Sequence, residues 1–160
     1  MGVGKSTVGR RLAAMLGTDF VDVDDEIERA ADRTVSEIFE AHGEAYFRAG
    51  ERRVIARLME EAHGVIATGG GAFVDPETRA LILDQAIAVW LDCDIDTLVE
   101  RTSRRNDRPL LRNGNAREIL TDLKDRRGAA YAEAQIHLVT DNGPHSETAQ
   151  RILEAIDAWL

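Results

Sequence analysis

The stretch Met1-Gly2-Val3-Gly4-Lys5-Ser6-Thr7 runs directly into an amphipathic helical pattern over residues 6–16. It contains the second half of the phosphate-binding motif G-x-x-x-x-G-K-[ST]. In that motif the glycines let backbone N–H groups surround a phosphate, and the N-terminus of the following helix adds a partial positive charge. We therefore expect Lys5 to contact the β- and γ-phosphates of a nucleotide, and the Ser6 hydroxyl to bind Mg²⁺.

Apolar runs alternate with helical patterns along the rest of the chain, which is typical of repeated βα units and a parallel sheet. We expect strands over residues 20–24, 65–67, 87–91 and 136–140. We expect helices over residues 6–16, 44–62, 76–83, 94–102, 115–131 and 146–160, and a short helix after a capping box at residues 34–37. The pattern shows no linker or repeat, and it predicts one α/β domain over residues 1–160.

The segment of about residues 103–115 is polar, rich in arginine and without periodicity. A loop of this length inside a small domain is typically functional, so we expect an arginine-rich lid.

The composition limits the classes of partner. The chain has 160 residues, 44% hydrophobic and 31% charged, with a formal net charge of −9. An acidic protein repels polyanions, so we expect no nucleic-acid and no membrane partner. No apolar run is long enough to span a membrane, and the single cysteine, Cys93, lies in an apolar run. We expect a cytoplasmic monomer in which Cys93 is a buried structural thiol.

Two carboxylates stand at the end of the first expected strand. Asp22 and Asp24 are two residues apart, which in a strand places both on one face, at the carboxyl edge where α/β sheets bind ligands. An isolated Asp-x-Asp is usually a solvated strand end. Beside a phosphate loop, however, the pair offers one carboxylate to a metal and one to the hydroxyl that accepts a phosphoryl group.

Three glycines and two arginines suggest the acceptor site. Gly69-Gly70-Gly71 follows the strand expected over residues 65–67. Because consecutive glycines lose much backbone entropy on folding, they indicate either a flexible turn or a close approach of the backbone to a ligand, and their neighbours favour the ligand. Arg48 and Arg127 could bind a carboxylate through paired N–H groups, although each alone is more often a surface ion-pair partner.

With these residues the chain resembles the shikimate kinases, a family of nucleoside-monophosphate-kinase-like P-loop enzymes. The signature residues are Arg48, Glu51, Ile55 and the run Val65-Ile66-Ala67-Thr68-Gly69-Gly70-Gly71. The resemblance extends from Met1 to the last helix. It implies a three-layer αβα fold and transfer of the γ-phosphoryl group of ATP, with Mg²⁺, to the 3-hydroxyl of shikimate.

The resemblance also implies a role for each candidate residue. For binding of ATP the implied residues are Gly2, Gly4, Lys5, Ser6, Thr7, Arg101 on the adenine and Arg108 of the lid on the phosphates. For Mg²⁺ they are Ser6 and Asp22. For shikimate they are Asp24 at the 3-hydroxyl, Arg48 and Arg127 at the carboxylate, and Gly69, Gly70 and Gly71 along the ring. The implied catalytic residues are Lys5, Asp24 and Arg108.

The family has a five-stranded sheet, whose first strand and a glycine come immediately before the present Gly2. We expect residues encoded upstream of Met1 to supply that strand, and its neighbours in the sheet to lack one partner without it. Two other functions compete. A gluconate-kinase-like enzyme is disfavoured by the Arg48/Glu51 spacing together with the three glycines. A nucleotide-binding domain without turnover is disfavoured by the set Lys5, Asp24 and Arg108.

Overall fold

The computed structural model describes residues 2–61, 64–104 and 114–160, so most of the expected lid, including Arg108, lies outside the described residues. The described residues form seven helices and four strands, with the order and bounds α1(Lys5–Leu16), β1(Asp19–Asp22), α2(Val23–Ala31), α3(Val35–Glu61), β2(Gly64–Ala67), α4(Pro76–Gln85), β3(Val89–Cys93), α5(Ile95–Ser103), α6(Ala116–Tyr131), β4(Ile136–Thr140) and α7(His145–Trp159). None of these helices, within the described ranges, is long and apolar enough to cross a membrane.

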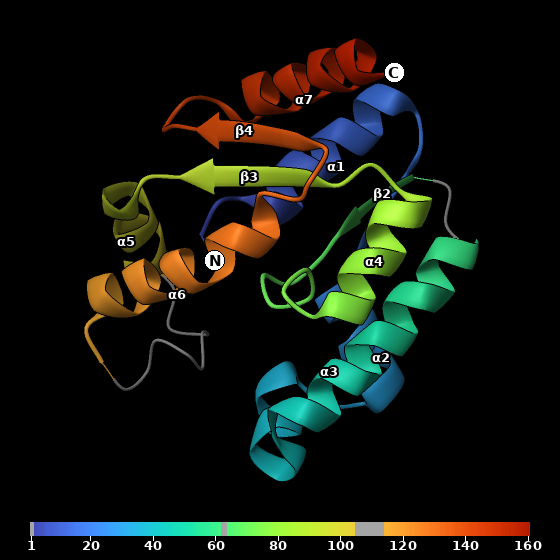
Figure 1. The fold of residues 1–160 in the computed structure, drawn as a ribbon, viewed down its shortest axis with the longest axis vertical. Helices are drawn as coiled ribbons and strands as arrows, with labels where there is room; N and C mark the ends of the chain where they lie inside the picture. The colour runs from blue at the N-terminus through green and yellow to red at the C-terminus, as the bar shows by residue number, and fades with distance from the viewer. Residues whose placement is uncertain (1, 62–63, 105–113) are drawn as a thin grey trace.

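The strands are parallel, as predicted, and they pair two by two (Figure 1). β1 pairs with β2 from Asp19↔Gly64 to Asp22↔Ala67. β3 pairs with β4 from Val89↔Ile136 to Cys93↔Thr140. Between the described residues no ladder joins the two pairs.

Helix α1 holds the two pairs of strands together. Its buried Val8 and Leu12 form one apolar cluster with Ala149 and Ile152 of α7. Val65 of β2, together with Val89 and Leu91 of β3 and Leu138 of β4, packs against that cluster. Burial of these side chains by a shared helix therefore connects β2 to β3 without a hydrogen-bonded ladder.

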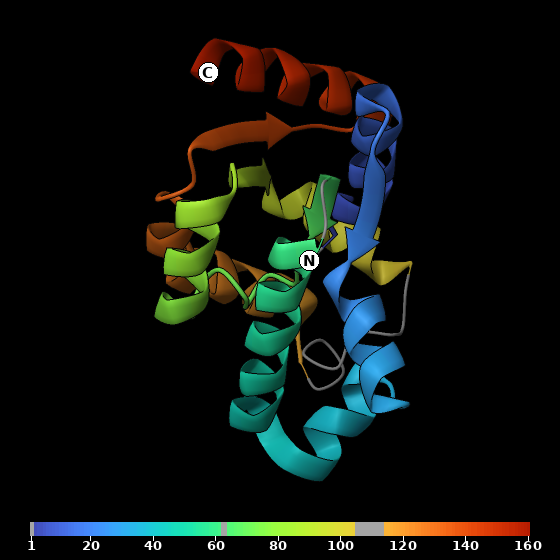
Figure 2. The same cartoon turned by 90° about the vertical axis from the view of Figure 1, so that its right-hand side faces the viewer.

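The other face of β1 and β2 packs on α2, α3 and α4. Ile27, Phe47 and Ile55 belong to this second core, and Val21 and Ile66 of the strands pack against it. Val65 and Ile66 are adjacent but enter different cores, as the two-residue period of a strand requires. Helices thus cover both sides of the strands, and Figures 1 and 2 show α7 at one end of the molecule and α2 and α3 at the other.

The predicted helix starts are confirmed by their caps. Thr34 Oγ1 accepts the Glu37 N–H at 3.2 Å while Glu37 Oε2 accepts the Thr34 N–H at 2.7 Å, the reciprocal capping box that the sequence predicts. Asp75, Asp94 and Asn115 cap α4, α5 and α6. The predicted break between a short and a long helix is also present, because Gly43 interrupts α3 with a φ of 80°.

Two predicted strands need correction. The strand expected over residues 20–24 ends at Asp22, because the Asp22 carboxylate accepts the Asp24 N–H and begins α2 there. The strand expected over residues 87–91 is β3, residues 89–93. Ala88 precedes the ladder and donates its N–H to the Gln135 side chain, so pairing with β4 begins one residue later and includes Asp92 and Cys93.

Candidate active site

The phosphate loop is built from glycines in backbone conformations that other residues rarely adopt. Gly2 has a φ of 77° and Gly4 a φ of 85°, both left-handed. A Cβ on Gly4 would lie 3.0 Å from His145 Cε1, so this position also lacks room for a side chain. The first turn of α1 contains Lys5, Ser6 and Thr7 and no acidic residue, which suits an N-terminus that binds an anion.

Ser6 and Asp22 meet as predicted. Ser6 Oγ donates to Asp22 Oδ2 at 2.7 Å, and Asp22 Oδ1 accepts the Asp24 N–H at 3.0 Å. The same carboxylate therefore contacts α1 and caps α2. Asp24 reaches the site from the first turn of α2, which corrects the sequence-based argument that placed it on the strand beside Asp22.

Asp24 lies in an environment that disfavours its charged form. Burial raises the pKa of Asp24 above its ordinary value, and the neighbouring Asp22 carboxylate adds to this effect. The cations Lys5 and Arg48 oppose it. Asp24 is thus a carboxylate with an increased affinity for a proton, close enough to Lys5 and Arg48 to be affected by their charges.

Each of the three consecutive glycines faces a different side chain. A Cβ on Gly69 would lie 3.4 Å from Glu51 Oε1 and 3.5 Å from Asp24 Oδ1. On Gly70 it would lie 2.6 Å from Arg127 Nη1, and on Gly71 it would overlap the Arg48 guanidinium. None of the three, all within the described part of the chain, has a positive φ. Space for the two arginines, rather than backbone freedom, therefore explains Gly70 and Gly71, whereas a Cβ on Gly69 would make ordinary van der Waals contacts.

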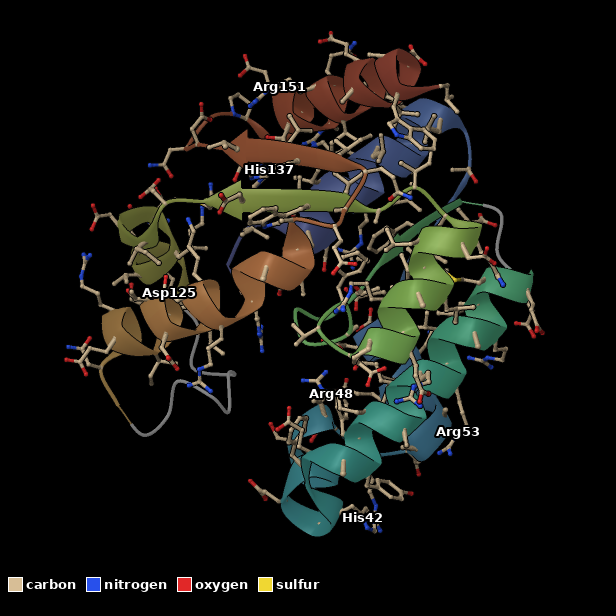
Figure 3. The ribbon with its side chains drawn as sticks, viewed as in Figure 1. His42, Arg48, Arg53, Asp125, His137 and Arg151 are labelled. Carbon is tan, nitrogen blue, oxygen red and sulfur yellow. The ribbon has the colours of Figure 1, made fainter. Side chains whose placement is uncertain are left out.

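Arg48 is held by a buried carboxylate one helical turn away. Its Nη1 donates to Glu51 Oε2 at 2.6 Å, and Glu51 is 2% exposed. Burial raises the pKa of Glu51, although the hydrogen bond and charge of Arg48 oppose this. Glu51 Oε1 is buried and accepts no hydrogen bond from the residues that the structure describes. Figure 3 shows Arg48 leaving α3 on the side of α6 and Arg53 leaving it on the opposite side.

Helix α6 supplies the second arginine and a tyrosine. Tyr131 Oη donates to the Gly70 carbonyl, and Arg127 lies one turn earlier on the same face of α6. Burial raises the pKa of Tyr131, against the charge and hydrogen bond of Arg127. Tyr131 was not among the predicted site residues; its signal in the sequence is the four-residue spacing from Arg127 on one helix face.

Arg101 connects the phosphate loop to the turn before α7. Its Nη1 donates to the Gly2 carbonyl at 3.3 Å and its Nη2 to the Asp141 carbonyl at 2.9 Å. Arg101 therefore lies beside the phosphate loop, while its contact with adenine stays a prediction. The predicted contact of Arg108 with the phosphates falls on a residue outside the described ranges.

A left-handed glycine loop at the start of α1, a Ser–Asp pair beside it and two pairs of parallel strands covered by helices define a P-loop phosphotransferase. Comparison with known proteins identifies the family. The family model described as "Shikimate kinase" matches residues 1–157. The chain belongs to the shikimate kinase family and is an ATP-dependent kinase.

Individual relatives support this family assignment. The shikimate kinase of Novosphingobium aromaticivorans is 61% identical over 164 residues, covering 100% of this chain and 85% of the relative. The shikimate kinase of Caulobacter vibrioides is 54% identical, covering 98% of this chain and 78% of the relative. Among solved structures, the Acinetobacter baumannii shikimate kinase in complex with shikimate has a TM-score of 0.95 and 40% identity, covering 99% of this chain and 89% of that chain. The Aquifex aeolicus enzyme has a TM-score of 0.85 and 34% identity, covering 99% and 92%.

Proposed function

We propose that this protein transfers the γ-phosphoryl group of ATP to the 3-hydroxyl of shikimate, giving shikimate 3-phosphate and ADP. The observation that carries this proposal is the arrangement around the three glycines. Arg48 and Arg127 approach Gly71 and Gly70 from different helices, while Asp24 approaches Gly69. A small acceptor with a carboxylate at one end and a hydroxyl at the other matches this set of groups.

The two arginines would bind the acceptor carboxylate. A guanidinium presents N–H donors in a planar fork that matches a carboxylate, and two such groups fix its orientation. Arg48 is oriented by the buried Glu51, so it loses little side-chain freedom when the acceptor binds. The glycine backbone leaves room for the acceptor ring next to these groups.

Asp24 would orient the reacting hydroxyl and accept its proton. The transition state of phosphoryl transfer is loose, so the enzyme mainly positions the reactants and stabilises charge. A carboxylate with a raised pKa holds the transferred proton better than an ordinary one as the oxygen–phosphorus bond forms. Asp24 therefore orients the hydroxyl first and accepts its proton late in the reaction.

The nucleotide phosphates would lie at the N-terminus of α1, where Gly2, Gly4, Lys5 and Thr7 surround them, with Arg101 beyond them toward adenine. From the sequence resemblance we assign Arg108 to the closing of the lid over the phosphates. These cationic and N–H groups neutralise the charge on the transferring group and exclude water.

Mg²⁺ fits the pair formed by Ser6 and Asp22. The ion prefers oxygen ligands and usually takes few from the protein, with the rest from water and phosphate. Ser6 Oγ and Asp22 Oδ2 are 2.7 Å apart at the end of the phosphate loop, which offers one hydroxyl and one carboxylate oxygen. When bound, Mg²⁺ supplies charge neutralisation at the phosphates.

We further propose that the chain functions as a single-domain cytoplasmic monomer, without a nucleic-acid or membrane partner. The net charge of −9 supports the absence of polyanionic partners. The one cysteine, Cys93, is 1% exposed, which suits a structural thiol in a reducing compartment. Sedimentation of the purified protein at micromolar concentration tests the monomer.

A coupled ADP-release assay tests the acceptor. The full-length protein is supplied with ATP and Mg²⁺ and then with shikimate, with gluconate or with no acceptor. We expect shikimate to stimulate ADP release and gluconate to leave the basal rate unchanged. Equal stimulation by both compounds, or by neither, would contradict the proposal.

A further inference from the structure

Helix α6 carries Arg127 and Tyr131 to the acceptor site, yet it has little apolar anchorage. Of its described side chains only Leu120, near its start, is buried, at 3% exposure. A cavity of about 60 Å³, lined by Trp90, Lys124 and Tyr131 among others, lies between α6 and β3. Side chains that line this hollow lack packing partners on one side, so polar contacts can contribute to the position of this part of α6.

Lys124 supplies a polar connection at this place. Its Nζ lies 3.0 Å from the Cys93 carbonyl, to which it donates, and 3.0 Å from Asp92 Oδ1. Leu120, Lys124 and Arg127 succeed one another at spacings of four and three residues, and Tyr131 follows four later, so all lie on one helix face. Lys124 thus joins β3 to the helix turn immediately before Arg127.

The receiving carboxylate is fixed in turn by β3 and β4. Asp92 Oδ1 accepts the Cys93 N–H at 2.8 Å, and His137 Nε2 lies 3.3 Å from Oδ2. Thr140 Oγ1 donates to the Asp92 carbonyl at 2.9 Å. Burial would raise the pKa of Asp92, but the hydrogen bond and charge of Lys124, with help from His137 and the Cys93 N–H, hold it below its usual value. Asp92 is therefore a charged and oriented partner.

An aromatic contact continues from the same strand face to Tyr131. Trp90 stands two residues before Asp92 and opposite His137 in the ladder. The Trp90 and His137 rings stack with centroids 3.9 Å apart and 9° between their planes, where His137 projects from β4 in Figure 3. The Trp90 ring lies 5.7 Å from Tyr131, which donates to the Gly70 carbonyl. Besides the apolar contact of Leu120 with Cys93, two contacts of α6 with β3 therefore lead to acceptor-site residues.

We propose that Lys124 is a positioning residue for shikimate: by binding Asp92 and the Cys93 carbonyl it sets where α6 sits on β3, and so where Arg127 meets the acceptor carboxylate. The inference rests on the proposed function, in which Arg127 binds that carboxylate. Alternatively, the Lys124–Asp92 contact would be a surface ion pair with negligible effect on the position of α6, since Lys124 is 37% exposed. Two observations favour a role in positioning α6. Lys124 also donates a hydrogen bond to the Cys93 carbonyl, and Asp92 is only 18% exposed.

The test compares Michaelis constants for the two substrates. Lys124→Met keeps the length of the side chain and removes the ammonium. We expect the KM for shikimate to rise about tenfold, because a charge-assisted hydrogen bond is lost, with the KM for ATP unchanged. Lys124→Arg, which keeps donors, should recover most of the effect. The control is Arg126→Met, which removes an equal charge from the same helix and breaks an exposed pair with Asp122. It should leave both constants unchanged.

Combination with Arg127→Ala separates positioning from general destabilisation. If Lys124 acts through Arg127, the double variant Lys124→Met/Arg127→Ala has the shikimate KM of Arg127→Ala alone. If instead the two fold-changes multiply, or Lys124→Met raises both KM values equally, the inference is wrong while the role of Arg127 stands. A normal shikimate KM for Arg127→Ala alone would overturn the proposed role of Arg127 and the inference with it. Asp92→Asn provides a second route to the same selective change in the shikimate KM, should Lys124→Met fail to fold.

Discussion

Arg48 Nη1 lies 2.6 Å from Oε2 of Glu51, a carboxylate 2% exposed and one turn further along α3. A buried carboxylate is costly without a partner, so this pair is more than a surface contact. Glu51 orients Arg48, and Arg48 in turn compensates the charge of Glu51. The group that we propose to bind the acceptor carboxylate is thereby coupled to the stability of the helix that carries it.

Replacing Arg48 should therefore affect both binding and stability. We expect Arg48→Ala to raise the KM for shikimate at least about tenfold, because the carboxylate loses a charged donor. We also expect it to lower the free energy of unfolding by on the order of 3 kcal/mol, because Glu51 is left buried without its cation. The matched control is Arg53→Ala, on the opposite side of α3 (Figure 3). An Arg53→Ala protein equally impaired for shikimate would show that the effect is not local.

The three glycines can be tested by adding a single methyl group. Gly71→Ala would place a Cβ on the Arg48 guanidinium, so Arg48 must move. We expect a higher KM for shikimate with an unchanged KM for ATP. Gly128→Ala is the control, because a Cβ there meets nothing within 4 Å, and in α6 it should raise stability by roughly 0.5–1 kcal/mol. If Gly71→Ala bound shikimate normally, the space argument would be wrong.

Asp24 should matter for turnover rather than for nucleotide binding. Asp24→Asn keeps the shape and removes the proton acceptor, so we expect kcat to fall at least about 100-fold with little change in the dissociation constant for ATP. Asp25→Asn, at the adjacent exposed position, is the control for the loss of one negative charge. Near-normal turnover of Asp24→Asn would show that Asp24 is a carboxylate at the start of α2 without a role in the reaction.

The raised pKa of Asp24 also predicts a pH dependence of stability. Folding favours the protonated form of this group, so the charged form opposes folding at neutral pH and the penalty is absent below the unfolded-state pKa. We therefore expect Asp24→Asn to be more stable than the wild type at pH 7, with the difference shrinking as the pH falls through the raised pKa. Denaturant titrations at several pH values measure it. If the stability difference between Asp24→Asn and the wild type grew toward acid pH, it would contradict a raised pKa of Asp24.

The lid arginine should act on the reaction step. We expect Arg108→Ala to lower kcat by about 10²–10³ because charge stabilisation of the transferring group is lost, while the KM for shikimate changes little. Arg104→Ala, which breaks an exposed pair with Glu100 at the end of α5, is the control. If Arg108→Ala weakened shikimate binding and Arg48→Ala lowered only kcat, the two assignments would be exchanged.

The sequence predicted the parts of the fold that local chemistry determines. Capping residues such as Thr34, Asp75 and Asn115 marked the helix starts correctly, because each satisfies N–H groups of its own helix. Asp24 was misplaced for the same kind of reason: Asp22 is also a cap, and a two-residue spacing does not reveal whether the chain has already turned into a helix. The bounds of β3 were placed two residues too early because they depend on pairing with β4, which is distant in sequence.

The features of the site that could not be predicted from the sequence depend on contacts between residues far apart in the chain. The resemblance placed Arg48, Arg127 and the glycines together, and the structure adds that Gly70 makes room for Arg127 and Gly71 for Arg48. Lys124 gave no signal, because a lysine in an amphipathic helix is ordinarily solvated and its partners Asp92 and Cys93 stand in another element. Residues that act through neighbours of this kind need the three-dimensional structure.

The product of the reaction tests the proposed function most directly. The protein is incubated with ATP, Mg²⁺ and shikimate, and the phosphorylated product is examined by ³¹P and ¹H NMR. Binding of the carboxylate by Arg48 and Arg127 with Asp24 at the 3-hydroxyl predicts one product, coupled through phosphorus to the proton at carbon 3. A phosphate on another hydroxyl, or only inorganic phosphate released from ATP, would contradict this account.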